Sequence, residues 1–244
     1  MTTAVVLAAG RGTRMGALTA ATPKPLLPVA GRPIIEHILA GLAAAGVLRA
    51  VVVTGHLGGA LERALGSGVR LGLEIAYCRQ DRADGTARAL LLTEALVGSA
   101  PFVLSWGDIL VPTGFYAEFL AAFARRPCDA QLAVNEVDDP WRGAAVYVDG
   151  DWRVHRVEEK PARGASATRW NNAGILLLTP LVFDYARRVA PSPRGEYELP
   201  QAIAQMVTDG RVVRAVAVRG PWSDVGTPDD LAAAQELFAA EGRR

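Results

Sequence analysis

Short, uninterrupted apolar runs separated by helix-length segments constrain the fold of this chain more than any other feature. Residues 3–9, 50–54 and 101–105 are mostly apolar and contain many valines. Strands that are apolar on both faces are typical of a parallel sheet covered by helices on both sides. Residues 34–45 place apolar side chains at helical spacing and end beside Gly46. The alternation predicts an α/β fold with right-handed crossovers, a Rossmann-like three-layer sandwich with a mostly parallel mixed sheet.

The rest of the chain fits this plan except in its middle. We expect further strands at 73–78, 173–178 and 212–218, and helices at about 59–65 and 86–96. Residues 130–157 read as short strands around a Gly150-Asp151 turn, which predicts a small β-rich lobe inserted into the fold. No internal repeat or linker is present, so we expect one domain over residues 1–244.

Composition excludes several classes of partner. The 244 residues carry 26 basic and 25 acidic groups, a net charge of +1, so neither nucleic acid nor an anionic membrane is an expected partner. The N-terminus lacks the pattern of a signal peptide, and no apolar run reaches the ~18 residues that span a bilayer. Cys78 and Cys128 have no metal-ligand spacing and read as free or buried thiols. We expect a cytoplasmic protein, with its oligomeric state, including a homo-oligomer, left open.

A glycine-rich turn with two arginines follows the first apolar run. Gly10, Gly12 and Gly16 can adopt backbone angles closed to other residues, and Arg11 and Arg14 favour an anion. The spacing G-R-G-T-R-M-G is one residue too long for the dinucleotide pattern, and no lysine stands where a P-loop needs one. A solvated surface turn is the alternative interpretation.

The stretch LAAGRGTRM…TPKPLLPVAGRPII, from residue 7 to 35, resembles the signature of sugar-1-phosphate nucleotidyltransferases. The resemblance implies the nucleotide-diphospho-sugar transferase fold, with a nucleotide-binding half at 1–110 and a sugar-phosphate-binding half at 111–244. In that family the motifs G-x-G-T-R and P-K-P bind a nucleoside triphosphate between them. The implied nucleotide-binding residues here are Leu7, Ala8, Ala9, Gly10, Arg11, Gly12, Thr13, Arg14 and Lys24.

Two details of this stretch carry expectations of their own. Pro23 and Pro25 should hold the backbone of Lys24 stiffly extended, ready to meet a phosphate. Gly16-Ala17 departs from the bulkier residue and proline common in the family, so we expect a looser loop there.

The stretch Q-D-R-A-D-G-T-A after the third strand predicts a base-reading loop. A glutamine amide has both a donor and an acceptor for a pyrimidine edge, and Gly85 would let a base approach the main chain. The spacing from Gln80 to Gly85 resembles that of the uridylyl- and thymidylyltransferases, with Thr86 included in the site. The alternative is a polar loop in which Asp84 or Thr86 caps the next helix.

Two aspartates that follow strands are candidate metal ligands. Asp108 ends W-G-D, and Asp224 stands in W-S-D-V-G-T. Mg²⁺ takes one or two carboxylates together with phosphates, although a turn or a helix cap would use aspartate equally well. The family resemblance implies that both aspartates bind Mg²⁺, the cofactor we expect.

The sugar-phosphate site is implied by the E-K-P of V-E-E-K-P. In the family the glutamate binds sugar hydroxyls and the lysine binds the phosphate. The resemblance therefore implies these roles for Glu159 and Lys160. Gly143 resembles a glycine whose backbone meets the sugar. Asn172 matches an asparagine of enzymes for N-acetylhexosamine phosphates.

The implied reaction is transfer of a nucleoside monophosphate from UTP or dTTP to a sugar 1-phosphate, giving an NDP-sugar and pyrophosphate, with Arg14, Lys24 and Lys160 as catalytic residues. Three alternatives stay open. They are a GTP-using mannose-1-phosphate-type enzyme, a cytidylyltransferase for a non-sugar phosphate such as phosphocholine, and a non-catalytic regulatory domain that binds a nucleotide sugar. The chain ends about twenty residues after Asp224, so we expect no second activity. His37, His56 and His155 receive no role.

Overall fold

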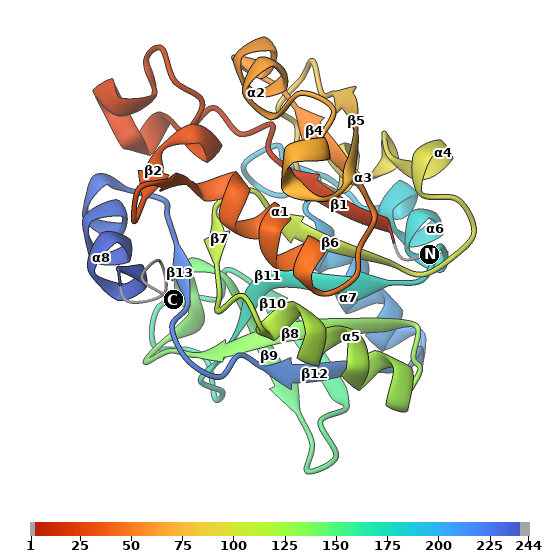
Figure 1. Cartoon of the computed structure of the whole chain (residues 1–244). Helices are drawn as coiled ribbons and strands as arrows, with labels where there is room; N and C mark the ends of the chain where they lie inside the picture. Colours follow the sequence, from red (N-terminus) through yellow and green to blue (C-terminus); the bar gives the residue numbers. More distant parts are fainter. Residues whose placement is uncertain (1–2, 240–244) are drawn as a thin grey trace.

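The structure is a computed structural model that describes residues 3–239. Its centre is a nine-stranded sheet in the order β10-β9-β11-β6-β1-β4-β5, with β8 pairing β11 and β12 pairing β8 (Figure 1). The strands are β1 (Thr3–Leu7), β4 (Arg49–Thr54), β5 (Glu74–Arg79), β6 (Phe102–Trp106), β8 (Ala130–Glu136), β9 (Ala144–Val148), β10 (Val154–Glu159), β11 (Trp170–Leu178) and β12 (Val213–Ala217). Two small pairs lie apart from it, β2 (Pro28–Val29) with β3 (Arg32–Pro33) and β7 (Ile109–Leu110) with β13 (Ser223–Asp224).

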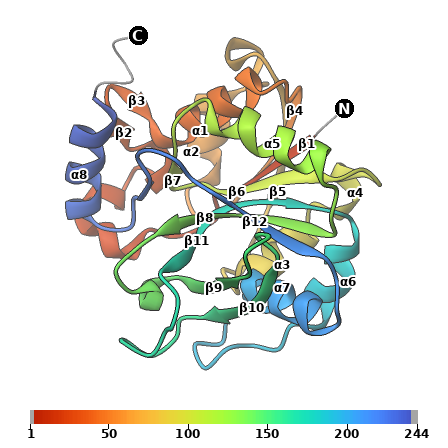
Figure 2. The same cartoon turned by 90° about the horizontal axis from the view of Figure 1, so that it is seen from below.

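Helices cover both faces of this sheet, as the apolar strands predict. They are α1 (Ile34–Ala44), α2 (Gly58–Leu65), α3 (Thr86–Leu91), α4 (Glu94–Val97), α5 (Phe115–Arg125), α6 (Leu181–Arg188), α7 (Leu199–Thr208) and α8 (Pro228–Phe238). Ala4 and Val6 of β1 pack in one core with α1, α2, α5 and α8. Val5 and Leu7 pack in the other core with α3, α4, α6 and α7, so the sheet is the middle layer (Figure 2).

The sheet is mixed, and the directions of its strands decide which strand ends lie at the same edge. β1 pairs in parallel with both β4 and β6, and β4 pairs in parallel with β5. β11 runs antiparallel to β6 and to β8, and β12 is parallel to β8. The carboxyl ends of β1, β4, β5, β6, β8 and β12 therefore share one edge with the start of β11.

The β-rich middle of the chain joins this sheet. β9 and β10 form the hairpin expected around Gly150, with Asp149 Oδ1 accepting from the backbone N–H groups of Asp151 and Arg153 at 2.9 Å each. A single register pair, Asn171 with Ala145, joins the hairpin to β11.

The helix expected over residues 86–96 is wrong, because the structure has two shorter helices there, α3 and α4. The hydroxyl of Thr93 is buried and donates to the Leu90 carbonyl at 2.7 Å. This local bond competes with the helical pattern and ends α3 early. No helix among residues 3–239 combines the length and the apolar composition that crossing a membrane requires.

Candidate functional site

The glycine-rich loop and Asp108 lie at the shared strand edge, because the parallel strands β1 and β6 both end there. The chain leaves β1 at Leu7, and the next amide, of Ala8, donates to the Val53 carbonyl at 2.9 Å. Gly107 follows β6 and donates its N–H to the Leu7 carbonyl at 2.9 Å. The glycine-rich loop and Asp108 are thereby held side by side, at the edge where α/β folds bind ligands.

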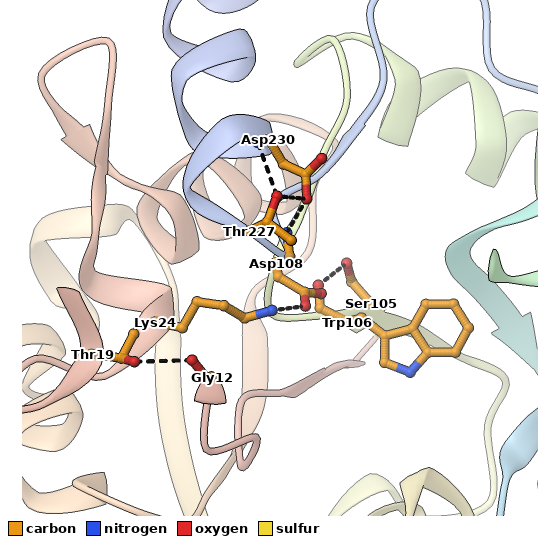
Figure 3. Close-up of polar contacts among 9 residues, drawn as sticks. Gly12, Thr19, Lys24, Ser105, Trp106, Asp108, Thr227 and Asp230 are labelled. Atoms are coloured by element: carbon orange, nitrogen blue, oxygen red, sulfur yellow. Dashed lines mark hydrogen bonds and ion pairs between the residues drawn. The ribbon is translucent and has the colours of Figure 1, made fainter. Parts of the chain in front are cut away.

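The glycine-rich loop lines a hollow of about 400 Å³. Gly12 has a φ of +64°, a region that glycine enters freely, and its carbonyl accepts from the Thr19 hydroxyl at 2.9 Å (Figure 3). Leu7, Ala8 and Ala9 are buried, whereas Gly10, Arg11, Thr13 and Arg14 are exposed to solvent. The hollow is lined by Arg11, Thr13, Gly16, Thr19, Ala20 and His56.

Lys24 is buried and forms an ion pair with Asp108 (Figure 3). The expectation of an extended backbone at Lys24 is wrong, because Lys24–Leu26 form a short 3-10 helix. Its bonds run from Leu26 N to the Pro23 carbonyl at 2.8 Å and from Leu27 N to the Lys24 carbonyl at 3.0 Å. Pro25 has no N–H and loses nothing in this turn, so the prolines position the lysine through a turn.

Asp224 joins Asp108 through a short pair of strands. Asp224 of β13 pairs with Ile109 of β7, and Val225 N donates to the Asp108 carbonyl at 3.0 Å. Thr227 then caps α8 by accepting from Asp230 N at 3.2 Å, and its own hydroxyl donates to Asp230 Oδ2 at 2.7 Å (Figure 3). A rigid strand-to-helix turn thus sets the position of Asp224.

The two carboxylates repel each other. Asp224 is exposed to solvent on one side. Desolvation by the protein atoms around it, the larger cause, and the charge of Asp108, the next, raise its pKa to about 6. Lys24 and Arg14 oppose this shift. Arg14 lies over Gly226, where a Cβ would stand 3.1 Å from Nη2. Two acids and two cations therefore converge beside the glycine-rich loop.

This donor set suits a magnesium ion that shares its ligands with phosphates. Mg²⁺ takes oxygen ligands, commonly one or two carboxylates completed by substrate phosphates and water. Asp108 and Asp224 supply two such carboxylates, and a cation between them would relieve their repulsion. Within residues 3–239 no group of three or more His, Cys, Asp or Glu side chains forms a closed metal cage.

Gln80 occupies the expected place after β5, and it is buried and internally bonded. Its Nε2 donates to Asp84 Oδ1 at 3.0 Å and to the Gly85 carbonyl at 3.1 Å. These bonds orient the amide and do not use its Oε1. Neither alternative capping residue caps α3, since Gly85 is the N-cap residue and no side chain bonds there.

Gly85 is required by a contact within the protein. Its φ of +117° and ψ of 168° belong to a region that only glycine adopts easily, and a Cβ would stand 2.3 Å from the Tyr197 carbonyl oxygen. Tyr197 N donates to the Asp84 carbonyl, and Ala87 N donates to the Tyr197 carbonyl, both at 2.8 Å. Thr86 Oγ1 accepts from Leu199 N at 2.8 Å. We call residues 192–199, which bind this loop, the strap.

Gly143, Glu159 and Lys160 also come together. Lys160 N donates to the Gly143 carbonyl at 2.8 Å, and Lys160 Nζ lies 4.0 Å from Glu159 Oε1. Lys160 has a φ of +43°, an uncommon value for a lysine that marks local strain. Gly143 packs so closely on Asn171 that a Cβ would stand 2.1 Å from Oδ1.

The side chain of Asn172 has a structural role within the protein. Its Oδ1 accepts from Gly174 N at 3.1 Å, inside the irregular part of β11 between Asn172 and Leu176. Trp222 Nε1 donates to the neighbouring Ala173 carbonyl at 3.0 Å and links this bulge to the segment that carries Asp224. Among residues 3–239 no hydrogen bond or ion pair joins Lys160 to the group formed by Lys24 and Asp108.

Glu198 and Arg194 also lie beside Glu159 and are not among the site residues that the sequence predicts. Glu198 is buried, precedes α7 as its N-cap residue, and makes no side-chain cap bond. Its carboxylate instead pairs with Arg194, whose Nη2 also lies 3.7 Å from Glu159 Oε1. Burial and the Glu198 charge raise the pKa of Glu159 well above its ordinary value. In the amino-acid sequence, Glu198 is marked only by its place before Leu-Pro, a pair that can begin a helix.

The chain matches the family described as "Nucleotidyl transferase" over residues 3–241. It is 33% identical over 230 residues to a glucose-1-phosphate thymidylyltransferase of Streptomyces antibioticus, covering 93% of this chain and 64% of the relative. This chain therefore spans less than two thirds of that protein's length. It is also 33% identical over 242 residues to the UTP–glucose-1-phosphate uridylyltransferase AglF of Haloferax volcanii, covering 98% of this chain and 97% of the relative.

Solved structures share the fold. A crystal structure from Bacillus anthracis, named as a candidate glucose-1-phosphate thymidylyltransferase in complex with a sucrose, superposes with a TM-score of 0.88 at 30% identity, covering 98% of this chain and 96% of that one. A UDP-glucose pyrophosphorylase complexed with UDP-glucose gives a TM-score of 0.88 at 22% identity over 99% of each chain, a likeness of fold alone. With the family match spanning residues 3–241, this chain belongs to the nucleotidyl transferase family.

Proposed function

We propose that this protein transfers a nucleoside monophosphate from UTP or dTTP to a sugar 1-phosphate and releases pyrophosphate. The observation that carries the proposal is the convergence of Lys24, Asp108, Asp224 and Arg14 beside a glycine-rich hollow at the carboxyl ends of the strands. Cations flanking a carboxylate pair suit a triphosphate with its metal. Glu159, Lys160 and Gly143 form a second group suited to a sugar phosphate.

The chemistry asks for positioning and charge neutralisation. An ionised oxygen of the sugar phosphate attacks the α-phosphorus, a new P–O bond forms, and the bond to the β-phosphate breaks as pyrophosphate leaves. No general base is needed, because the attacking oxygen carries no proton. Arg14, Lys24 and the loop amides of Gly10 to Thr13 would hold the triphosphate, and Lys160 would hold the attacking phosphate. Asp108 and Asp224 would hold Mg²⁺, which when bound neutralises charge between the two phosphates.

The proposed choice of a pyrimidine base rests on the orientation of Gln80. With Nε2 donating to Asp84 and Gly85, Oε1 is the acceptor available to the N3–H of uracil or thymine. Cytosine has no N3 proton, so it would require the amide to flip and lose both bonds. This favours UTP and dTTP over CTP, by about 1–3 kcal/mol if base-edge recognition elsewhere is a guide.

Glucose 1-phosphate is the proposed first sugar substrate, because the relatives from Streptomyces antibioticus and Haloferax volcanii are both named for it. Asn172 gives no independent support for an N-acetylhexosamine phosphate, because its Oδ1 already bonds Gly174. We also propose that the protein works in a reducing compartment such as the cytoplasm. Cys78 and Cys128 are free thiols, which is compatible with that setting.

The test is pyrophosphate release by purified protein with Mg²⁺, five nucleoside triphosphates and a panel of sugar 1-phosphates and phosphocholine. We expect turnover with UTP or dTTP and a sugar 1-phosphate. Asp84→Ala removes one of the two bonds that orient the glutamine amide and should reduce the preference over CTP, while Gln80→Ala should lower kcat/KM for UTP and dTTP most. A preference for GTP, or selectivity unchanged in both variants, would remove Gln80 from the base site. Binding of an NDP-sugar without turnover of any pair would favour a regulatory domain.

A further inference from the structure

The carboxyl groups of Glu159 and Glu198 are buried against each other. Glu159 ends β10, and Glu198 begins α7, with side chains only 16% and 7% exposed. Both carboxyl groups face the same nitrogen, Arg194 Nη2, which pairs with Glu198 and lies 3.7 Å from Glu159 Oε1. Two carboxyl groups held so close can bond each other only when one of them carries a proton. Burial makes the doubly ionised state costly for such a pair.

The surrounding charges decide which group keeps the proton. Arg194 Nη2 pairs directly with Glu198 and lies 3.7 Å from Glu159 Oε1, while its Nε lies 3.8 Å from Glu196 Oε2. Lys160 Nζ lies 4.0 Å from Glu159 and is the other cation facing the pair. Arg194 thus holds Glu198 ionised, whereas Glu159 is left with the weaker contacts.

The neighbouring acid on the strand does not compete for these cations. Glu158 faces away, and its Oε2 accepts from Arg156 at 2.6 Å. The group around Glu159 therefore contains two carboxyl groups, Arg194 and Lys160, with Glu196 at its rim.

We propose that Glu159 and Glu198 share one proton, and that Glu198 is thereby a positioning residue that keeps Glu159 neutral and Lys160 free for the phosphate of the sugar substrate. This proposal rests on the proposed function. A neutral Glu159 donates its O–H to Glu198 and keeps its carbonyl oxygen for a sugar hydroxyl. An ionised Glu159 would repel Glu198 and compete with the incoming phosphate dianion for Lys160.

The kinetic test separates the two substrates. Above pH 7 a sugar phosphate is already a dianion, since its second pKa is about 6. In the native protein we expect KM for the sugar 1-phosphate to rise with pH once the shared proton dissociates, by up to about tenfold per pH unit. KM for the triphosphate should stay flat for as long as the base keeps the N3 proton that Gln80 is proposed to bind. A flat sugar-phosphate KM up to pH 9.5 would overturn the proposal.

Two variants of the strap separate the effect of the Glu159–Glu198 pair from that of the neighbouring Glu196. In Glu198→Gln an amide donates to an ionised Glu159, so KM for the sugar phosphate should be raised at pH 7 and should change less than about twofold up to pH 9.5. Glu196→Gln is the matched control, since the Glu196 side chain forms an ion pair with Arg194 and with neither member of the pair, and it should keep the native profile. A native profile in Glu198→Gln would contradict the proposal.

An infrared measurement tests the proton without activity. The native protein should have a protonated-carboxyl C=O band that persists at neutral pH and disappears on alkaline titration, and this band should be missing in Glu159→Gln and in Glu198→Gln. Thermal melts confirm that each variant is folded. If no triphosphate and sugar phosphate react but the band is present, the proposed function fails and the shared proton stands. If turnover is normal and the band is absent, the shared proton is wrong.

Discussion

Asp108 and Asp224 are the residues on which the proposed metal site depends. We expect Asp108→Asn or Asp224→Asn to lower turnover at least about 100-fold, because each change removes one of the two negative charges proposed to hold the cation. Asp224→Asn should leave the melting temperature unchanged or raise it, since an ionised Asp224 is crowded by Asp108. Pyrophosphate release and a thermal melt measure the two effects. Near-normal turnover in the folded double variant would refute the assignment.

The two lysines should be separable in kinetics. Lys24 pairs with Asp108 beside the glycine-rich loop, whereas Lys160 faces Glu159. Lys24→Ala is expected to impair mainly the use of the triphosphate, and Lys160→Ala mainly the use of the sugar phosphate. The measurement is KM and kcat for each substrate in each variant. If Lys160→Ala leaves both sugar-phosphate parameters at native values, the role inferred from E-K-P is wrong.

At the scale of elements, the strap ties α3 to α7 through main-chain bonds. Gly85→Ala would place a Cβ against the Tyr197 backbone at a φ that alanine resists, and we expect it to lower the free energy of unfolding by at least about 1–3 kcal/mol. Gly114→Ala is the matched control. Gly114 precedes α5 as its N-cap residue, with a helical φ of −68° and open space around it, so this change should be neutral or slightly stabilising. Urea titrations compare the two, and equal stability would mean that the strap contact is not needed.

At the scale of the whole molecule, the cysteines report on unfolding. Cys78 lies on β5 and Cys128 precedes β8, and burial raises the pKa of both thiols to about 11. Only the thiolate reacts quickly with an alkylating agent, so both should react slowly with iodoacetamide at pH 8 and quickly once urea unfolds the chain. Cys78→Ser and Cys128→Ser assign the two rates. Fast reaction of either thiol in the folded protein would show that its segment opens locally.

Local sequence patterns were enough to predict the layers and the loops that carry most of the site. Apolar runs such as residues 3–9 are buried on both faces because they lie between two layers of helices. Gln80, Asp108 and the glycine-rich loop each follow a strand directly, so once a parallel sheet is predicted they must meet at one edge. The family signature added the expectation that Asp224 joins them.

The folded structure decided details that the sequence patterns left open, two of them through local hydrogen bonds and one through a contact between distant segments. A 3-10 turn, closed by bonds that proline tolerates, places Lys24 where an extended backbone was expected. Thr93 splits a helix whose apolar spacing continues through it. Gly85 is explained only by the backbone of Tyr197, more than a hundred residues away along the chain.

The pairing of Glu159 with Glu198 belongs to the same class. The amino-acid sequence by itself determined which segments become buried strands and which side chains stand at strand ends, because periodicity and local backbone preference act over a few neighbouring residues. It could not determine that two glutamates share a buried space or that Arg194 neutralises one of them. Desolvation and charge pairing depend on distances in the folded chain, and only the packing of α7 against β10 sets those distances.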